Sequence, residues 1–255
     1  MAALGRRTLL ALRETGRALL MLMRAANYLP QAFSKRSHHE VFAQMFITGV
    51  KSIGVITVVA LFTGMILALQ AGLALRDYGQ EANISTLVAV TMLREMGPFM
   101  TGLILAASVG SAICAQLGTM TVSEEIAALE VMSIDPHRFL VMPRLFALSL
   151  MAPAMTLYAN MVGILGGSLV GAFQLGVSFQ KYFDNAFLVA EYKDLFVGIF
   201  KAYIFGLIIT TVACHQGFAT REGAVGVGRN TRKTVVVSFL LILIMGYFIT
   251  GLFYR

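Results

Sequence analysis

The chain has 255 residues, of which 58% are hydrophobic and 13% are charged, and its mean hydropathy is +0.78. This composition excludes a water-soluble globular domain, because a soluble fold of this length has too little interior for so many apolar side chains. The net charge of +7 does not indicate nucleic-acid binding, because lysine and arginine positions in a membrane protein report its orientation.

Five stretches of the sequence are long and apolar enough to cross a membrane as helices, which takes ~20 residues for ~30 Å of hydrocarbon. They are predicted at 53–73, 86–116, 145–172, 195–217 and 235–253. The strand-like alternation of outer-membrane barrels is not found in the sequence. The sequence therefore predicts an all-α integral membrane protein, organised as a single domain over residues 1–255.

Basic residues outside these spans are distributed unequally between the two sides of the membrane. Eight precede the first span, two lie in 117–144 and four in 218–234, which is read as a glycine-rich loop. Four lie in the segments of the other side: Arg76, Lys181, Lys193 and Arg255. Because basic residues concentrate in cytoplasmic loops, the N terminus is predicted to be cytoplasmic and the C terminus to lie outside.

Residues 1–30 are predicted to form a basic amphipathic helix that ends near Pro30. Leucines occupy the face opposite a narrow stripe of arginines. The stripe consists of Arg6, Arg13, Arg17 and Arg24. Such a helix is expected to lie in the interface of the inner leaflet with its arginines near lipid phosphates; packing against protein is the alternative.

The second predicted span contains two adjacent charges, Arg94 and Glu95, roughly 12 Å from its outer end at 1.5 Å per residue. A charge at the centre of a span costs roughly 2.5–3.5 kcal/mol, and adjacent helical residues point about 100° apart. Each charge therefore needs a partner elsewhere, and Lys201 lies at a similar depth in the fourth span. A Glu95–Lys201 pair is the hypothesis, either functional or serving only to fix helix register. Gly97-Pro98 predicts a kink directly after the charges.

Residues 121–136, between the second and third spans, are predicted to form a short cytoplasmic helix. Thr121 and Glu124 have the spacing of a capping box, and Asp135-Pro136 ends the helix because a residue before proline avoids helical geometry. The segment is too short and too acidic to span a membrane. It is either a surface helix or a helix that docks into a partner's groove.

No metal or cofactor site is predicted in this chain. Cys114 and Cys214 lie in or at the end of apolar spans, where packing is the usual role of cysteine. His38 and His39 have no carboxylate or cysteine cluster to complete a metal site. No ATP-hydrolysing motif occurs, so any ATP and Mg²⁺ would be held by a separate chain.

Several motifs occur in one order along the chain: LREMGP, GSA, LGTM, EEIAALEVMSIDP, LVMPRL and GAVGVGRNT. Together they resemble the MlaE/YrbE family, the permease subunits of bacterial ABC transporters that maintain lipid asymmetry by moving phospholipid between inner and outer membranes. The resemblance covers essentially the whole chain. It implies a non-catalytic homodimer in a Gram-negative inner membrane, with an interfacial N-terminal helix, five spans per subunit and a periplasmic C terminus. It also implies a cytoplasmic ATPase, a STAS-domain protein and a periplasmic MCE-domain lipid-binding ring as partners.

The resemblance also implies roles for individual positions. The lipid-binding positions, in a cavity at the dimer axis, are Leu67, Ala74, Leu75, Tyr78, Arg94, Glu95 and Met96. The positions of a coupling helix seated in the ATPase are Glu124, Glu125, Leu129, Met132, Asp135 and Pro136. An outward-facing apolar chamber with one basic and one acidic residue suits a phospholipid, because the acyl chains need apolar walls and the phosphate favours Arg94.

This chain departs from the family pattern at a few positions. Ala107, Ser108 and Val109 replace a common Gly-Arg-Ala, so an arginine is lost there. Gln116 and Val225 each stand where a glutamate is usual, and Glu125 replaces the usual glutamine. The paired loss of an arginine and a glutamate from the second span is consistent with a neutral replacement that leaves no charge stranded.

Two other classes of function remain open on the residues alone. An independent secondary transporter or channel would use Arg94, Glu95 and Lys201 as an ion path and would work without an ATPase. An intramembrane enzyme would use Glu95 with Cys214 or His215, but these are predicted near opposite membrane faces.

Overall fold

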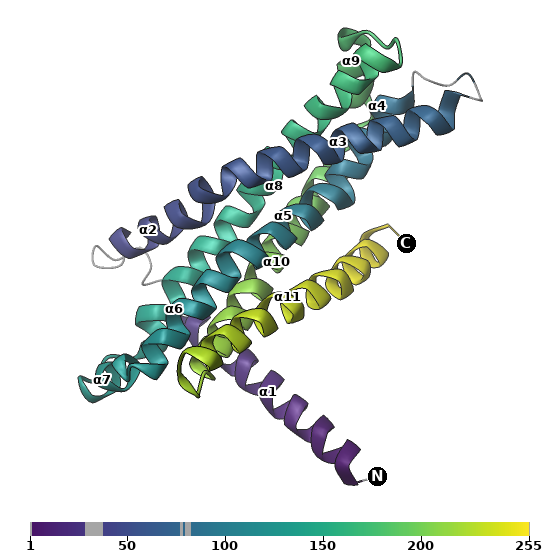
Figure 1. The fold of residues 1–255 in the computed structure, drawn as a ribbon. Helices are drawn as coiled ribbons and strands as arrows, with labels where there is room; N and C mark the ends of the chain where they lie inside the picture. Colours follow the sequence, from purple (N-terminus) through teal and green to yellow (C-terminus); the bar gives the residue numbers. More distant parts are fainter. Residues whose placement is uncertain (1, 29–37, 77–78, 80–82, 255) are drawn as a thin grey trace. The chain divides into compact units, whose positions relative to one another are not determined.

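The computed structural model of the protein describes residues 2–28, 38–76, 79 and 83–254. This part of the chain is helical and contains no strand (Figure 1). Its elements in chain order are α1 (Ala2–Asn27), α2 (His38–Gly49), η2 (Val50–Ser52), α3 (Ile53–Arg76), α4 (Ile84–Thr91), η4 (Met92–Met96), α5 (Gly97–Leu105), η5 (Ala106–Gly110), α6 (Ser111–Val122), α7 (Glu125–Val131), η6 (His137–Val141), α8 (Met142–Gln174), α9 (Phe179–Val189), α10 (Tyr192–Phe218) and α11 (Gly223–Phe253).

Within the part of the chain that the structure describes, five helical segments are long and apolar enough to cross a membrane. They are His39–Leu75, Ile84–Val122, His137–Gln174, Tyr192–Phe218 and Gly223–Phe253. Each contains one of the predicted spans, so the all-α prediction is confirmed, and the five predicted spans match five helices of suitable length and composition. Helical hydrogen bonding continues past the apolar stretches, and the helices are therefore longer than the spans.

Contacts along the chain divide it into two compact units. Unit 1 comprises Met1–Thr48, Ala106–Leu148 and Gly206–Leu240. Unit 2 comprises Gly49–Leu105, Ser149–Phe205 and Leu241–Arg255. Several long helices contribute residues to both units.

In unit 2, helices α3 and α8 approach each other closely at glycines. A Cβ atom on Gly64 would overlap the backbone of Gly163, and one on Gly166 would overlap the carbonyl of Leu61. Glycine is therefore required where these backbones meet, as expected for close helix packing in membranes. The buried apolar residues beside this contact are Ile56, Ala60, Met155 and Ala159.

The second membrane span of the chain contains a π-helical turn, η4, in the part that belongs to unit 2. This turn lies directly before the Gly97-Pro98 pair. Proline has no backbone N–H, so the carbonyl of Arg94, four residues earlier, loses its normal helical partner. Lys201 supplies the missing donor, because its Nζ lies 2.8 Å from the Arg94 carbonyl oxygen. The predicted break is thus a local widening of the helix that exposes a backbone acceptor inside the unit.

In unit 1 the predicted capping box at Thr121 is wrong. Helix α6 continues through Thr121, whose hydroxyl donates to the carbonyls of Leu117 (2.8 Å) and Gly217 (3.2 Å). The chain then reverses at Glu124, which has a left-handed φ of 60°. A hydroxyl already bonded to its own helix cannot cap the next one, and the separate helix of the 121–136 segment is only α7.

The predicted loop 218–234 is also wrong for most of its length. Helix α11 begins at Gly223, where φ is +64°, and glycine is the residue that adopts this turn without steric cost. Asn230 fixes the start of α11 to the end of α10, because its Nδ2 donates to the Gln216 carbonyl and the Thr220 hydroxyl, each at 3.1 Å. The glycine-rich sequence suggests a loop, but tertiary contacts stabilise the first turns of α11 in spite of its glycines.

Candidate functional site

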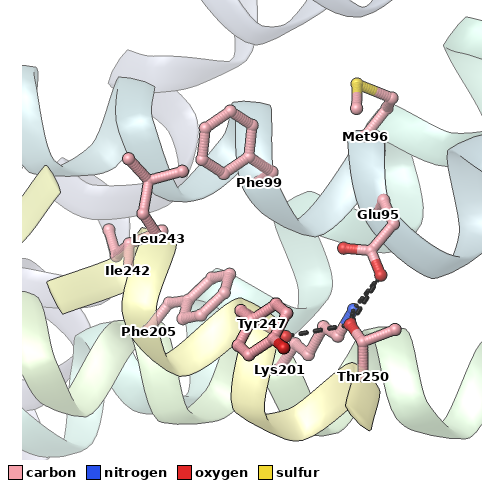
Figure 2. Close-up of a pocket in the computed structure, with 10 residues that line it drawn as sticks. Glu95, Met96, Phe99, Lys201, Phe205, Ile242, Leu243, Tyr247 and Thr250 are labelled. Carbon is pink, nitrogen blue, oxygen red and sulfur yellow. Dashed lines mark hydrogen bonds and ion pairs between the residues drawn. The ribbon is translucent and has the colours of Figure 1, made fainter. Parts of the chain in front are cut away.

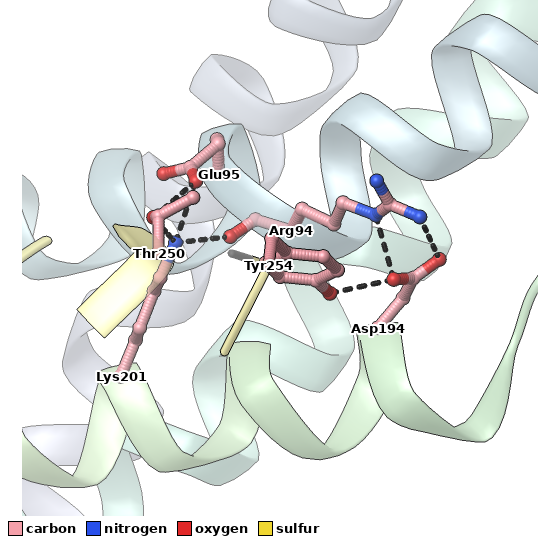
Figure 3. A network of polar contacts seen from close by, with 6 residues as sticks. All are labelled: Arg94, Glu95, Asp194, Lys201, Thr250 and Tyr254. Carbon is pink, nitrogen blue, oxygen red and sulfur yellow. Dashed lines mark hydrogen bonds and ion pairs between the residues drawn. The ribbon is translucent and has the colours of Figure 1, made fainter. Parts of the chain in front are cut away.

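The charges of the second span belong to one polar network within unit 2 (Figure 3). Arg94 and Glu95 lie on η4 and extend in different directions, as expected for neighbours on a helix. Glu95 reaches Lys201 of α10, with 2.6 Å between Glu95 Oε1 and Lys201 Nζ. The hypothesis that these two residues meet therefore agrees with the geometry, whereas Arg94 has a different partner.

Lys201 is the centre of the first half of this network. Its side chain is 1% exposed, and its ammonium donates to the Arg94 carbonyl at 2.8 Å, to Glu95 Oε1 at 2.6 Å and to Thr250 Oγ1 at 2.7 Å. Thr250 lies on α11, and its hydroxyl is 2.6 Å from the same Glu95 oxygen. An ammonium has three donors, so this buried cation is fully satisfied.

Arg94 is held by a carboxylate that the sequence analysis did not identify. Its Nε and Nη2 donate to the two oxygens of Asp194, at 2.6 and 3.1 Å, which is the bidentate geometry of a strong charge-assisted pair. Asp194 is fully buried, and Arg94 is 34% exposed. Asp194 lies seven residues before Lys201, so both face the same side of α10. That spacing is the signal by which the sequence could have revealed it.

Tyr254 closes the second half of the network at the end of the chain. Its hydroxyl donates to Asp194 Oδ1 at 2.6 Å, and the Arg94 guanidinium lies 4.5 Å from the centre of its ring, within range of a cation–π contact. Burial, together with the hydrogen bond to Asp194, raises the pKa of the Tyr254 phenol. The tyrosine therefore remains a donor throughout the physiological pH range.

A pocket of about 350 Å³ adjoins this network within unit 2 (Figure 2). Its polar end is formed by Glu95, Lys201 and Thr250. The rest of its wall is mainly apolar and consists of Met96, Phe99, Phe205, Ile242, Leu243, Gly246 and Tyr247. Small-molecule sites commonly combine an apolar wall with a few fixed polar groups at this size. The arrangement suits an amphiphile, with a hydrocarbon portion along α5 and α11.

Among the described residues, the others predicted for lipid binding lie on a second surface of unit 2. Leu67, Leu75 and Met96 are half-buried and pack against one apolar cluster of α3, α4 and α8. Ala74 is exposed, and Tyr78 lies outside the described residues. Met96 lines the pocket as well, so it is the residue shared between the two surfaces.

The residues predicted to couple to an ATPase lie on or beside α7, which has no buried residue. Glu124 and Glu125 are exposed and Leu129 is half-buried. The apolar residues Val131 and Met132 are 86% and 62% exposed. An acidic segment that presents apolar side chains to its surroundings suits a docking helix.

The end of this segment is held in place by Asp135. Its carboxylate accepts from the Tyr28 hydroxyl at 3.0 Å and from the backbone N–H of His137 at 2.9 Å. The hydrogen bond to the Asp135 carboxylate raises the pKa of Tyr28. Pro136 is buried beside it, so Asp135 and Pro136 fix the base of the segment, whereas α7 projects from it.

Gln116, one of the departures from the family pattern, contacts a buried arginine of unit 1. Arg144 is 4% exposed and donates to the Leu140 carbonyl at 2.6 Å and to Gln116 Oε1 at 2.9 Å. Its Nε is buried and has no hydrogen-bond partner among the described residues. The amide is thus a neutral acceptor for a cation that a glutamate at this position would neutralise.

Comparison with known proteins matches this chain to a family of permeases. The family described as Permease MlaE matches residues 41–252. The intermembrane phospholipid transport system permease protein MlaE of Haemophilus influenzae is 34% identical over 257 residues, covering 99% of this chain and 97% of that protein. A probable ABC transporter permease protein of Rickettsia prowazekii is 38% identical over 215 residues, which cover 84% of this chain and 83% of that protein. The chloroplastic protein TRIGALACTOSYLDIACYLGLYCEROL 1 of Arabidopsis thaliana is 33% identical over 208 residues, which cover 82% of this chain and 59% of that protein.

Proposed function

This chain belongs to the MlaE permease family, and from that premise we propose that it is the membrane subunit of an ABC transporter that moves phospholipids between the inner and outer membranes of a Gram-negative bacterium. Hydrolysis of ATP with Mg²⁺ takes place in a separate cytoplasmic ATPase, and this chain performs no chemistry of its own. The observation that carries the proposal is the apolar pocket of unit 2, which ends at a satisfied ion pair.

The pocket accommodates hydrocarbon from the lipid, and the polar network fixes the shape of the polar end of the pocket. Apolar walls contributed by α5 and α11 gain from contact with acyl chains, whereas the Glu95–Lys201 pair stays hydrogen-bonded and needs no ligand. In the homodimer, two such pockets lie beside the dimer axis together with Leu67, Ala74, Leu75 and Tyr78. This assigns Glu95 and Lys201 the role of holding the pocket in shape.

Arg94 binds the lipid phosphate only at the stage of the transport cycle when Asp194 releases it. A lipid phosphate favours an arginine, but Asp194 already occupies the guanidinium in a bidentate pair. The phosphate therefore replaces Asp194 as partner of Arg94 when α10 and η4 shift during the transport cycle. Exchange between two anionic partners lets the site bind and release a headgroup without leaving either charge unpaired for long.

Helix α7 and its flanks, Glu124 to Pro136, transmit motion from the ATPase. The exposed apolar side chains of Val131 and Met132 enter a groove of the ATPase, and the fixed base at Asp135 carries the movement into the rest of unit 1. A STAS-domain protein on the cytoplasmic side and a periplasmic MCE-domain ring complete the assembly. The N terminus is cytoplasmic and the C terminus periplasmic, in keeping with the distribution of basic residues.

The test is to purify the tagged chain from its native host, identify co-purifying proteins and lipids by mass spectrometry, and measure ATP-dependent lipid transfer. We expect an ATPase, an MCE-domain protein and bound phospholipid. Gly246→Leu narrows the pocket, since Gly246 lines it, and is expected to reduce bound lipid and transfer severalfold. Gly251→Leu is the matched control, because no atom lies within 4 Å of a Cβ at that position on the same helix.

The outcomes separate the permease from its rival. Substrate movement driven by an ion gradient, with no ATPase bound, would replace the proposal with an independent secondary transporter. Normal lipid content and transfer in Gly246→Leu would place the lipid elsewhere in the protein and refute the pocket assignment alone.

A further inference from the structure

A second cavity, of about 620 Å³, lies within unit 1. Its walls come from the second half of α1, the start of η6, the end of α10 and the turn that follows α10. The lining residues are Glu14, Arg17, Leu20, Met21, Arg24, His137, His215, Phe218, Ala219 and Arg221. The transport mechanism proposed above does not use this cavity.

The cavity is strongly basic. It is lined by three guanidinium groups, Arg17, Arg24 and Arg221, and by a single carboxylate, Glu14. That carboxylate lies 3.4 Å from Nε2 of His215. No carboxylate among the described residues forms an ion pair with any of the three arginines. Three cations from two separate segments, with one carboxylate among them, give the cavity a net positive potential that attracts an anion.

The polar groups of the cavity are also incompletely satisfied. His137 contributes an imidazole whose Nδ1 is buried and has no hydrogen-bond partner among the described residues. Its ring is fixed edge-on against Phe218, with 5.8 Å between the ring centres. A buried nitrogen without a partner costs free energy, and an oxygen of a bound ligand would satisfy it.

One side of the cavity is apolar. On α1, Leu20 and Met21 lie between Arg17 and Arg24 at helical spacings of three, four and seven residues, so all four share one face. Met21 is 5% exposed and Leu20 is 58% exposed, so the apolar surface runs from the interior to the rim. Phe218 extends it on α10. A small inorganic anion would leave this surface uncovered.

We propose that this cavity binds the phosphate group of an anionic phospholipid, with the guanidinium groups of Arg17, Arg24 and Arg221 around the phosphate and the first part of the acyl chains along Leu20, Met21 and Phe218. The arginine stripe of α1, which was expected to face the lipid interface generally, thus forms part of a defined site. Guanidinium groups bind phosphate oxygens bidentately, and bound lipid joins α1 to the end of α10. Binding at this site does not depend on transport, so its test is independent of the test of the permease function.

The absence of tryptophan from the sequence makes a local test possible. Leu20→Trp in the full chain, purified in detergent, places one fluorophore at the rim of the cavity. Brominated phosphatidylglycerol is expected to quench it saturably. Arg17→Gln with Arg221→Gln should weaken the apparent affinity about tenfold or more, since each charge-assisted hydrogen bond contributes enough for such a change.

Two controls and one replacement variant make the result decisive. Arg13→Gln removes the same charge from an exposed position of α1 that does not line the cavity and should change the affinity less than about twofold. Leu188→Trp places the fluorophore on an exposed position of unit 2 and should show no saturable quenching. If the double variant unfolds, Arg221→Gln alone, in an exposed turn, replaces it.

Several outcomes would overturn the proposal. These are unsaturable quenching of Leu20→Trp, an equal loss of affinity in Arg13→Gln, or full affinity in the cavity variants. Displacement of the lipid by inorganic phosphate at equal concentration would assign the site to a free anion, and equal binding of brominated phosphatidylcholine would show that net negative charge is not recognised.

Discussion

The charged network of unit 2 has surroundings opposite to those of buried Arg144 and the exposed cavity arginines of unit 1. In unit 2, Lys201 and Arg94 each bind a carboxylate within 2.6 Å. In unit 1, Arg144 is buried against neutral acceptors, and the arginines of the second cavity have no ion-pair partner among the described residues. Compensated charges hold helices together, whereas uncompensated ones retain the capacity to bind something else. The comparison assigns a structural role to the first set and a ligand-binding or adaptable role to the second.

Breaking the compensated set should have the largest effect. Lys201→Met leaves Glu95 without its counter-ion and the Arg94 carbonyl without a donor. We expect it to lower the free energy of unfolding by about 3 kcal/mol, the lower end of the range for one-sided loss of a buried pair, because Glu95 remains 39% exposed. Denaturant unfolding in mixed micelles measures the change.

The double variant Glu95→Gln/Lys201→Met distinguishes a charge pair from two independent residues. Removal of both charges should recover about 1 kcal/mol relative to the sum of the single losses, since residues in contact are not additive. Strict additivity of the two substitutions would show that the pair is not coupled and that Lys201 acts mainly through the Arg94 carbonyl and Thr250.

Supplying the missing charge in unit 1 should have the opposite sign. Gln116→Glu places a carboxylate at the acceptor position of Arg144 and is expected to raise the free energy of unfolding by about 1 kcal/mol, because hydrogen bonds between charged groups are stronger than neutral ones. Gln116→Leu removes the acceptor and should destabilise by a similar amount. A destabilising Gln116→Glu would show that the neutral glutamine is required where it stands.

The pH dependence of stability tests how far Tyr254 belongs to the compensated set. Burial and the Asp194 hydrogen bond raise its pKa above the ordinary 10.0. A group with a raised folded-state pKa contributes stability that is complete below its unfolded-state pKa and is lost as pH rises beyond it. The wild type should therefore lose stability above about pH 10 more steeply than Tyr254→Phe. Tyr247→Phe removes only the hydroxyl from a side chain that is 77% exposed, and it should leave the slope unchanged. An equal change in both variants would show that Tyr254 does not act through the network.

The smallest effect on stability is expected at α7. Val131→Ser changes a side chain that is 86% exposed and should alter the free energy of unfolding by less than about 0.5 kcal/mol. If α7 docks into an ATPase, the same substitution should weaken that association about fivefold, since about 1 kcal/mol of apolar burial is lost. Leu188→Ser, equally exposed on α9, should change neither quantity, and undiminished ATPase binding by Val131→Ser would argue against docking through this face.

Local sequence patterns were sufficient for the helical class and the five spans. Apolar stretches of 19 residues or more, such as 235–253, leave few alternatives to a helix, because backbone polar groups in lipid must be satisfied within the same segment. The meeting of Glu95 with Lys201 was also within reach, since both charges need a partner at similar depth. The ends of the helices could not be predicted from local sequence, because Asn230 extends α11 through contacts with residues ten and fourteen positions earlier.

The sequence by itself determined the class, the number of spans and the residues whose charge requires compensation, because hydrophobicity and the cost of a charge in lipid act on each segment separately. Only the tertiary structure decided which partner each charge has. It paired Arg94 with Asp194 and Tyr254, made the carbonyl freed by Pro98 an acceptor for Lys201, and gathered Arg17, Arg24 and Arg221 around one cavity. Those outcomes depend on which helix faces meet, and that is set by packing among distant segments, including the glycine contacts of α3 and α8.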